Sequence, residues 1–257
     1  MSENKIPVLE VIDLGIDFGG LTAVNDFNLK VYNNEIVGLI GPNGAGKTTV
    51  FNMLTKVYQP SRGTIKFCGQ DTAGMSVVEM NKAGIARTFQ NIRLFSNMSV
   101  IDNVKIGMNN QITYNNIEAV LRLPKYREQE AKVTEEAMEL LRIFGLDKDA
   151  DLIAGNLPYG AQRRLEIARA MATKPKLLLL DEPAAGMNPQ ETADLMDMIR
   201  FVRDHFHIAI LLIEHDMKLV MGICERISVL NYGMLLAEGT PVEIQANPQV
   251  IKAYLGE

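Results

Sequence analysis

The sequence predicts an α/β fold in which a parallel sheet forms the core of one domain. The runs KLLLL (176–180) and IAILLI (208–213) are apolar almost without interruption, as is typical of strands buried on both faces of a parallel sheet. Residues 41–48 read GPNGAGKT, follow a strand-like run and lead into a helical pattern. From about 75 to 170 the pattern becomes mostly helical. A length of 257 residues fits a single α/β domain with an inserted helical part.

The N-terminal part of this domain is predicted to form strands. Short runs rich in β-branched and other apolar residues cover 8–18 and 27–40, and Asn, Asp and Gly interrupt them as in tight turns. A further strand is predicted at 63–69, where GTIKFCG has glycine at both ends.

The inserted part is predicted to contain a long helix. In 128–145, EQEAKVTEEAMELLRIFG, apolar residues recur at a spacing of three and four, and Gly145 ends the pattern. The residues of this apolar face are Val133, Ala137, Leu140, Leu141 and Phe144. Such a face is expected to pack against a neighbouring element.

Helix starts in the C-terminal third are marked by capping residues. In NPQE (188–191), Asn188 is a predicted N-cap, proline takes the first helical position and Glu191 completes a capping box. TPVE (240–243) repeats this pattern, and NPQVIKAYLG follows it from residue 247. We therefore expect short helices at about 240–256.

Composition and charge exclude several classes of protein. The net charge of −5, with acidic and basic residues interspersed, argues against a general nucleic-acid binder. Two cysteines in unrelated segments and three scattered histidines give neither a disulfide framework nor metal-ligand spacing. The apolar runs are too short to span a bilayer, and the polar N-terminus lacks the apolar core of a secretory signal. The basic residues Arg163, Arg164 and Arg169 have helical spacing and are predicted to form a solvated helix face.

The segment GPNGAGKT matches the phosphate-binding pattern G-x-x-x-x-G-K-[ST]. Gly41, Gly44 and Gly46 allow backbone N–H groups to turn toward phosphate oxygens, and the following helix directs its positive dipole end at them. Lys47 would place a charge on the β- and γ-phosphates, and the Thr48 hydroxyl can bind Mg²⁺. A glycine-rich turn without function is the alternative, and the preceding strand and following helix argue against it.

Two acidic residues and a histidine follow the predicted parallel strands. Asp181 ends the run LLLLD, where a buried carboxylate is costly unless it faces a metal or a donor. Glu182 comes next and could act as a general base on water. His215 follows the next apolar run, at the sheet edge where α/β proteins bind ligands. The alternatives are that the acidic pair only ends a strand and that the histidine is structural.

Together these motifs resemble the ATP-binding subunits of ABC transporters over essentially the whole chain. The resemblance implies a P-loop NTPase (ABC ATPase) fold for 1–257, with an antiparallel β subdomain and a helical subdomain at about 91–168. Walker A would span 41–49, and Walker B would end at Asp181. The implied nucleotide contacts in Walker A are Gly41, Asn43, Gly44, Ala45, Gly46, Lys47, Thr48 and Thr49.

The resemblance also assigns residues outside these two motifs. In RTFQNIRLF (87–95), Gln90 would contact Mg²⁺ and the attacking water, alongside Thr48 and Asp181 as metal contacts. Glu182 would be the catalytic base and His215 the switch histidine. Phe18 would stack on adenine, although a core aromatic is the plain alternative.

The signature motif, usually L-S-G-G-Q, is altered here to LPYGAQ at 157–162. Leu157 and Gly160 remain, and Gln162 lies one place late, whereas Pro158 and Tyr159 replace serine and glycine. In this family the signature closes over the ATP of the opposing subunit. A lost hydrogen bond to a charged group would weaken that ATP site by roughly 1.5–3 kcal/mol, unless backbone donors suffice. Asn188 replaces the usual aspartate of the D-loop AAGMN. This change could weaken communication between the two ATP sites, but the N-cap role of Asn188 before Pro189 is the preferred explanation.

The match narrows to ATPases of branched-chain amino acid importers, and to the larger of their two ATPase subunits, the LivG type. It rests on RTFQNIRLF, YGAQRRLEIARAMAT, DEPAAGMNP and LLAEGTPVEIQANPQVIKAYLG. The implied cofactors are ATP and Mg²⁺. The implied partners are a second related ATPase, two membrane permeases and, through the complex, an extracytoplasmic substrate-binding protein, but no nucleic acid. The implied location is the cytoplasmic face of the membrane, as a peripheral subunit.

Three alternatives stay open at this point. The chain could be a soluble ABC ATPase acting on ribosomes or DNA, although such proteins usually carry two ATPase halves or long coiled-coil arms, which are absent from this sequence. It could bind ATP without turnover, against which Glu182 and His215 argue. It could also serve an importer for another small solute, because cargo choice lies in the permeases and binding protein.

Overall fold

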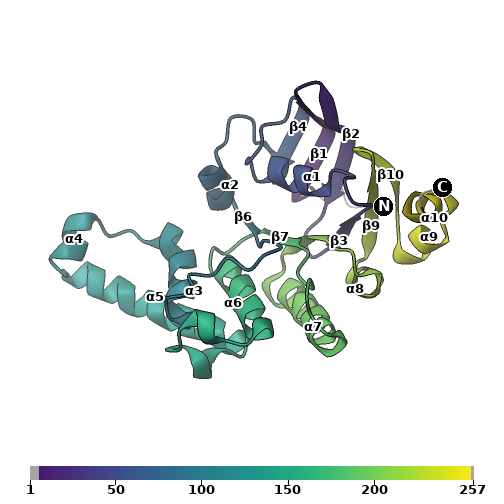
Figure 1. The fold of residues 1–257 in the computed structure, drawn as a ribbon. Helices are drawn as coiled ribbons and strands as arrows, with labels where there is room; N and C mark the ends of the chain where they lie inside the picture. Colours follow the sequence, from purple (N-terminus) through teal and green to yellow (C-terminus); the bar gives the residue numbers. More distant parts are fainter. Residues whose placement is uncertain (1–5, 256–257) are drawn as a thin grey trace. The chain divides into compact units, whose positions relative to one another are not determined.

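The computed structural model describes residues 6–255, which form two compact units (Figure 1). The first unit contains the described residues up to 90 and from 176 onward, and the second contains 91–175. The second unit is therefore an insertion in the chain of the first.

A six-stranded sheet is the centre of the first unit, with strand order β10-β9-β3-β8-β7-β6. Its strands are β3 (Ile36–Ile40), β6 (Ile85–Arg87), β7 (Leu177–Asp181), β8 (Ala209–Ile213), β9 (Arg226–Asn231) and β10 (Met234–Gly239). All neighbours are parallel except β9 and β10. Every residue of β3, β7 and β8 is buried, which confirms the strands predicted from the apolar runs.

An antiparallel sheet of order β2-β1-β4-β5 forms the rest of the β structure in this unit. Its strands are β1 (Leu9–Phe18), β2 (Leu21–Val31), β4 (Arg62–Phe67) and β5 (Gln70–Asp71). Apolar residues of both sheets, such as Phe27 from β2 and Leu39 from β3, belong to one hydrophobic core. The fold is therefore α/β with an antiparallel β subdomain, as predicted.

The helices of the first unit are α1 (Lys47–Leu54), α2 (Val77–Ala83), α7 (Pro189–Phe206), α8 (Met217–Ile223), α9 (Pro241–Ala246) and α10 (Pro248–Leu255). Three of them, α7, α9 and α10, begin where the capping residues predict. Asn188 and Glu191 form a complete capping box at α7, and Thr240 and Glu243 form another at α9. The side chain of Asn247 accepts hydrogen bonds from the first turn of α10.

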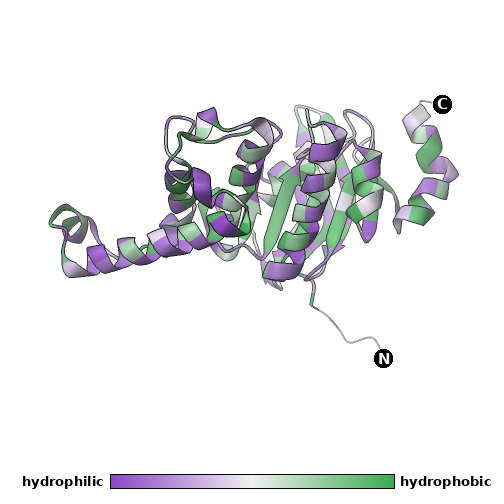
Figure 2. Ribbon diagram, turned by 90° about the horizontal axis from the view of Figure 1, so that it is seen from below, coloured by the Kyte–Doolittle hydropathy of each residue, from purple (hydrophilic) through white to green (hydrophobic). Residues whose placement is uncertain are grey.

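The second unit is helical. It contains α3 (Val100–Gly107), α4 (Asn116–Val120), α5 (Pro124–Ile143) and α6 (Tyr159–Met171), with 3₁₀ turns at Met108–Gln111, Asp147–Asp149 and Ala154–Asn156. The long helix α5 is largely hydrophilic, and its buried residues are those of the predicted apolar face (Figure 2). The unit ends at Pro175, a few residues past the expected boundary near 168, because α6 itself continues to Met171.

The prediction that Arg163, Arg164 and Arg169 form a solvated face is wrong. These residues lie in α6. Arg163 is completely buried, and its Nη1 donates to Oε2 of Glu166 at 2.7 Å, one turn along α6. Glu166 is also buried and accepts from the backbone N–H of Arg93. Arg169 is partly buried and lies over the ring of Phe95. An arginine can be buried when a carboxylate pairs with it, which spacing alone does not reveal.

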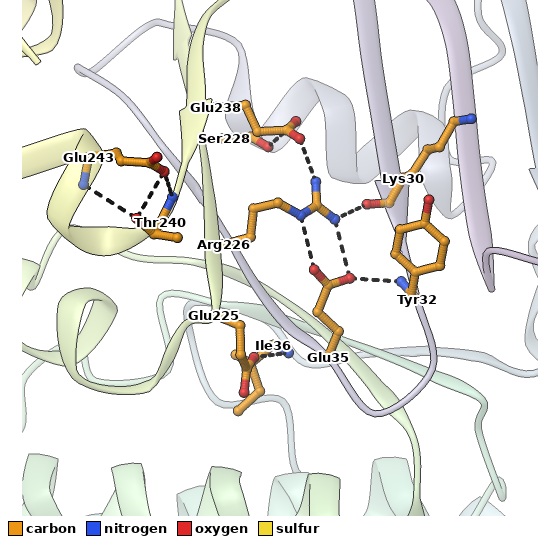
Figure 3. Close-up of polar contacts among 10 residues, drawn as sticks. All are labelled: Lys30, Tyr32, Glu35, Ile36, Glu225, Arg226, Ser228, Glu238, Thr240 and Glu243. Carbon is orange, nitrogen blue, oxygen red and sulfur yellow. Dashed lines mark hydrogen bonds and ion pairs between the residues drawn. The ribbon is translucent and has the colours of Figure 1, made fainter. Parts of the chain in front are cut away.

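Arg226 joins four segments of the first unit at the amino end of β9 (Figure 3). Its Nε and Nη2 donate to the two carboxylate oxygens of Glu35 at 3.0 and 3.2 Å, and Nη1 donates to Glu238 at 2.7 Å. Nη2 also bonds to the carbonyl of Lys30. The Arg226 side chain is only 20% exposed, so the guanidinium ties β2, the turn before β3, and β10 to β9.

Replacing Arg226 with methionine should lower the free energy of unfolding by about 2 kcal/mol, because two partly buried carboxylates would lose their partner. The midpoint of urea unfolding measures the loss. Lys30→Met is the control, since Lys30 pairs with Glu10 at 3.0 Å but is largely exposed. Its effect should be much smaller. Equal losses for the two variants would contradict this role of Arg226.

Candidate nucleotide site

The loop between β3 and α1 has a backbone that favours glycine at three positions. Gly41, Gly44 and Gly46 all have φ in the left-handed or positive range, at 152°, 79° and 104°. A Cβ on Gly41 would approach the carbonyl oxygen of Leu230 to 2.0 Å. Gly46 is the N-cap of α1, and no side chain of the described residues caps that helix. The first-turn N–H groups can therefore bind an anion.

Lys47 is the first residue of α1 and is buried, with 6% of its surface exposed. Its Nζ donates to the carbonyl oxygens of Gly41 at 2.7 Å and Pro42 at 2.9 Å. Burial lowers the pKa of Lys47, and the nearby charges of Glu182 and Asp181 oppose this shift. An ammonium has three N–H donors, so a third donor remains for a ligand.

A hollow in the surface lies beside this loop. It is lined by Leu21, Thr22, Ala23, Gly44, Ala45, Gly46, Lys47, Thr48, Thr49 and Tyr232. Asn43 lines a neighbouring hollow with Lys252 and Ala253 of α10. The structure thus brings most of the predicted phosphate-binding residues to one cavity, and it adds Tyr232 and Leu21, which the sequence did not indicate.

Phe18 lies at the end of β1 and is 43% exposed, which excludes the alternative that it is a core aromatic. Its ring packs edge-on against Tyr58, with centroids 5.3 Å apart. Phe18 is not among the residues that line the hollow, so its contact with adenine stays a prediction.

Asp181 ends β7 with a buried carboxylate, which is 5% exposed. Its Oδ2 accepts a hydrogen bond from Nη2 of Arg87 at 2.7 Å. Arg87 ends the neighbouring strand β6 and also donates to Asn52 of α1 at 2.8 Å. Sequence reasoning missed Arg87, which links the β6 end, the phosphate loop helix and Asp181.

Glu182 is held between the other two predicted catalytic side chains. Nε2 of Gln90 donates to its Oε2 at 2.6 Å, and Nε2 of His215 lies 2.8 Å from its Oε1. These three residues follow β6, β7 and β8, which are adjacent in the sheet. The carboxyl ends of parallel strands lie at the same edge of a sheet. Gln90 and His215 therefore meet Glu182 there, although they are 92 and 33 positions away from it in the sequence.

Comparison with known proteins identifies the family. The model of the family described as "ABC transporter" matches residues 24–185. The chain belongs to the ABC transporter family. A second model, "Branched-chain amino acid ATP-binding cassette transporter", matches 234–257.

Two relatives within the ABC family have been named for amino acid transport. The high-affinity branched-chain amino acid transport ATP-binding protein LivG of Escherichia coli K12 is 51% identical over 98% of both chains. BraF of Pseudomonas aeruginosa, described in the same words, is 49% identical over the same shares. A solved nucleotide-free ATP-binding cassette from an ABC transporter superposes with a TM-score of 0.84, 28% identity, and coverage of 98% of this chain and 100% of that one.

The altered ABC signature motif lies in the second unit, at the start of α6. Pro158 is the N-cap, and no side chain of the described residues caps the helix there. Leu157 is buried, and its carbonyl accepts from Nε2 of Gln162 at 2.8 Å. The N–H of Gly160 therefore lies in a first turn without a side-chain cap among the described residues, although the serine hydroxyl is missing.

Among residues 6–255, no helix is long and apolar enough to cross a membrane.

Proposed function

We propose that this chain binds and hydrolyses ATP to power an ABC importer for branched-chain or other hydrophobic amino acids. One observation carries the catalytic part: Glu182 is held between Gln90 and His215 at the sheet edge that also carries the phosphate loop. The identity of 51% to a branched-chain amino acid transport ATP-binding protein supports the cargo class.

The proposed nucleotide contacts are those of the phosphate loop. The N–H groups of Gly44 and Gly46 and the start of α1 would surround the phosphates, because a helix N-terminus without a side-chain cap favours anions. Lys47 would add its third donor to a phosphate oxygen. Phe18, which is exposed, would stack on the base.

The residues present fit Mg²⁺ held together with nucleotide phosphates. No group of three His, Cys, Asp or Glu side chains in the described residues could hold a metal alone. Asp181 and the Thr48 hydroxyl are oxygen ligands of the type Mg²⁺ prefers when it shares its coordination with phosphates and water. Arg87 occupies Oδ2 of Asp181, and the described structure gives Oδ1 no hydrogen-bond partner. Gln90 is a third proposed contact, and bound Mg²⁺ would neutralise charge on the phosphates.

The proposed chemistry depends on Glu182. As a carboxylate it would accept a proton from water that attacks the γ-phosphoryl group. Gln90 and His215 hold its two oxygens, which restricts its orientation. Lys47 and the loop N–H groups would stabilise the charge that develops on the phosphate oxygens.

The proposed setting is the cytoplasmic face of the membrane, as a peripheral subunit of a larger complex. The partners are a second related ATPase and two permeases that receive a substrate-loaded, extracytoplasmic binding protein. ATP would close the two ATPases on each other, so that the signature at Leu157, Gly160 and Gln162 faces the ATP of the partner. The helical segment after Gln90 would transmit the movement to a permease.

The missing serine in this signature suggests two unequal ATP sites. The site that contains Glu182 would be closed by the partner's signature, whereas the partner's site would be closed by Pro158 and Tyr159. Replacing Glu182 by glutamine should then reduce transport more, by about 10-fold, than the equivalent change in the partner ATPase. The uptake rate of the assembled transporter measures both changes. Equal losses of transport in the two variants would contradict the proposal that the two ATP sites are unequal.

Gentle solubilisation of membranes with a tagged chain tests the function. The proposal expects two multi-span permeases and a second, distinct ATPase to co-purify. Recovery with ribosomes or DNA instead would support the rival function of a soluble ABC ATPase. Hydrolysis of ATP by the purified complex distinguishes these two functions, importer ATPase and soluble ABC ATPase, from that of a protein that only binds ATP.

A further inference from the structure

Glu214 is a buried carboxylate for which the proposed chemistry has no role. It lies between β8 and α8, directly before His215, and is 3% exposed. No ion pair to it is present among the described residues 6–255. A buried carboxylate without a cation requires several hydrogen-bond donors. The N–H groups that donate to Glu214 therefore show which backbone segments this side chain connects.

The two carboxylate oxygens of Glu214 bind two different segments. Oε1 accepts the backbone N–H of Ala184 at 2.7 Å, two residues after Glu182. Oε2 accepts the N–H of His215 at 2.8 Å and that of Asp216 at 3.2 Å. One side chain thus joins the backbone that carries the catalytic glutamate to the backbone that carries the histidine.

The same two segments meet at two further points. The N–H of Glu182 donates to the carbonyl of Ile213 at 2.9 Å, and the side chains of Glu182 and His215 lie 2.8 Å apart. Glu182 has φ of 47°, a conformation in which a residue other than glycine is strained and needs support from its surroundings. The bond to Ala184 lies two residues after this strained residue.

From this geometry we infer that Glu214 is a positioning residue for ATP hydrolysis, which sets the Glu182–His215 contact through the backbone on both sides of it. The inference rests on the proposed function. It requires both oxygens to be acceptors, because each faces N–H groups and neither can be replaced by a donor.

This requirement makes Glu214→Gln a sharp test. The amide has nearly the same shape, but its NH₂ group must face either the N–H of Ala184 or those of His215 and Asp216. One of the two segments is therefore released whichever way the amide lies. We expect kcat for ATP to fall about 10- to 100-fold in the assembled transporter, with the KM for ATP changed less than about 3-fold, because the phosphate loop is untouched.

Glu35→Gln is the matched control. Glu35 also has a largely buried carboxylate that accepts a backbone N–H, from Tyr32 at 2.8 Å (Figure 3). It precedes β3, however, whereas Glu182 follows β7, so the two residues lie at opposite ends of the parallel strands. It should cost stability without a selective fall in kcat. If Glu214→Gln lowers kcat no more than Glu35→Gln does, the inference is overturned.

A double-mutant cycle that combines Glu214→Gln with His215→Ala tests the inference even if Glu214→Gln also lowers the stability of the protein. If Glu214 acts through the histidine, adding Glu214→Gln to His215→Ala should lower kcat much less than it does alone. Full additivity would overturn the inference. Absence of ATP turnover in the unsubstituted transporter would instead contradict the proposed function, so the two failures are distinguishable.

Discussion

Replacing Glu182 with glutamine should reduce ATP turnover by about 100- to 10,000-fold, because the amide cannot accept the proton of the attacking water. Glutamine has almost the same shape as glutamate and can still contact Gln90 and His215, so the site should keep its structure. ATP should therefore still bind. The measurement is steady-state phosphate release by the purified transporter.

The accumulation of bound ATP gives a second readout for this variant. If hydrolysis opens the closed pair of ATPases, then the Glu182→Gln transporter should retain ATP where the unsubstituted protein retains ADP. Glu243→Gln is the control, because the hydrogen bonds of Glu243 within residues 6–255 are those of the capping box of α9, where glutamine can also serve. Turnover close to that of the control would rule out Glu182 as the catalytic base.

Replacing Lys47 with methionine should weaken ATP binding by at least about 100-fold, because a buried charge on the β- and γ-phosphates would be lost. Methionine suits the space, since the lysine stem is already buried. Titration with a non-hydrolysable ATP analogue measures the affinity. Lys56→Met is the matched control, because Lys56 is equally buried, at 6% exposed, and burial lowers its pKa too.

The affinity for ATP should also depend on pH through Lys47. Burial lowers its pKa, so the ammonium loses its proton at a lower pH than an exposed lysine does. Only the charged form attracts phosphate. Affinity should therefore be highest below the lowered pKa and should fall as the pH rises through it, and this fall should be absent in Lys47→Met. A pH profile shared by both proteins would contradict the role of Lys47.

The placement of the phosphate loop, Glu182 and His215 could be predicted from sequence because it follows from local rules, whereas Gln90 was indicated only by the family resemblance. A strand, a glycine-rich turn and a helix place Lys47 without help from distant residues. Glu182 and His215 each follow a parallel strand, and the ends of such strands share one edge. The sequence pattern therefore predicted that Glu182 and His215 lie near each other, as well as which residue types stand at these positions.

The partners of buried charges could not be predicted in the same way. Arg87 and Asp181 are 94 positions apart, and nothing in either segment indicates that β6 and β7 are neighbours. Arg163 has the spacing of a solvated face, yet Glu166 and the surrounding unit bury it. Glu214 differs from an ordinary surface glutamate only in the N–H groups that the folded backbone directs at it.

ATP-driven uptake of labelled branched-chain amino acid into vesicles that contain the complete transporter is the most direct test of the function. The account predicts uptake that requires ATP and is lost in Glu182→Gln while the complex still assembles. Uptake that persists in this variant, or a complex that hydrolyses ATP without moving any such amino acid, would contradict it.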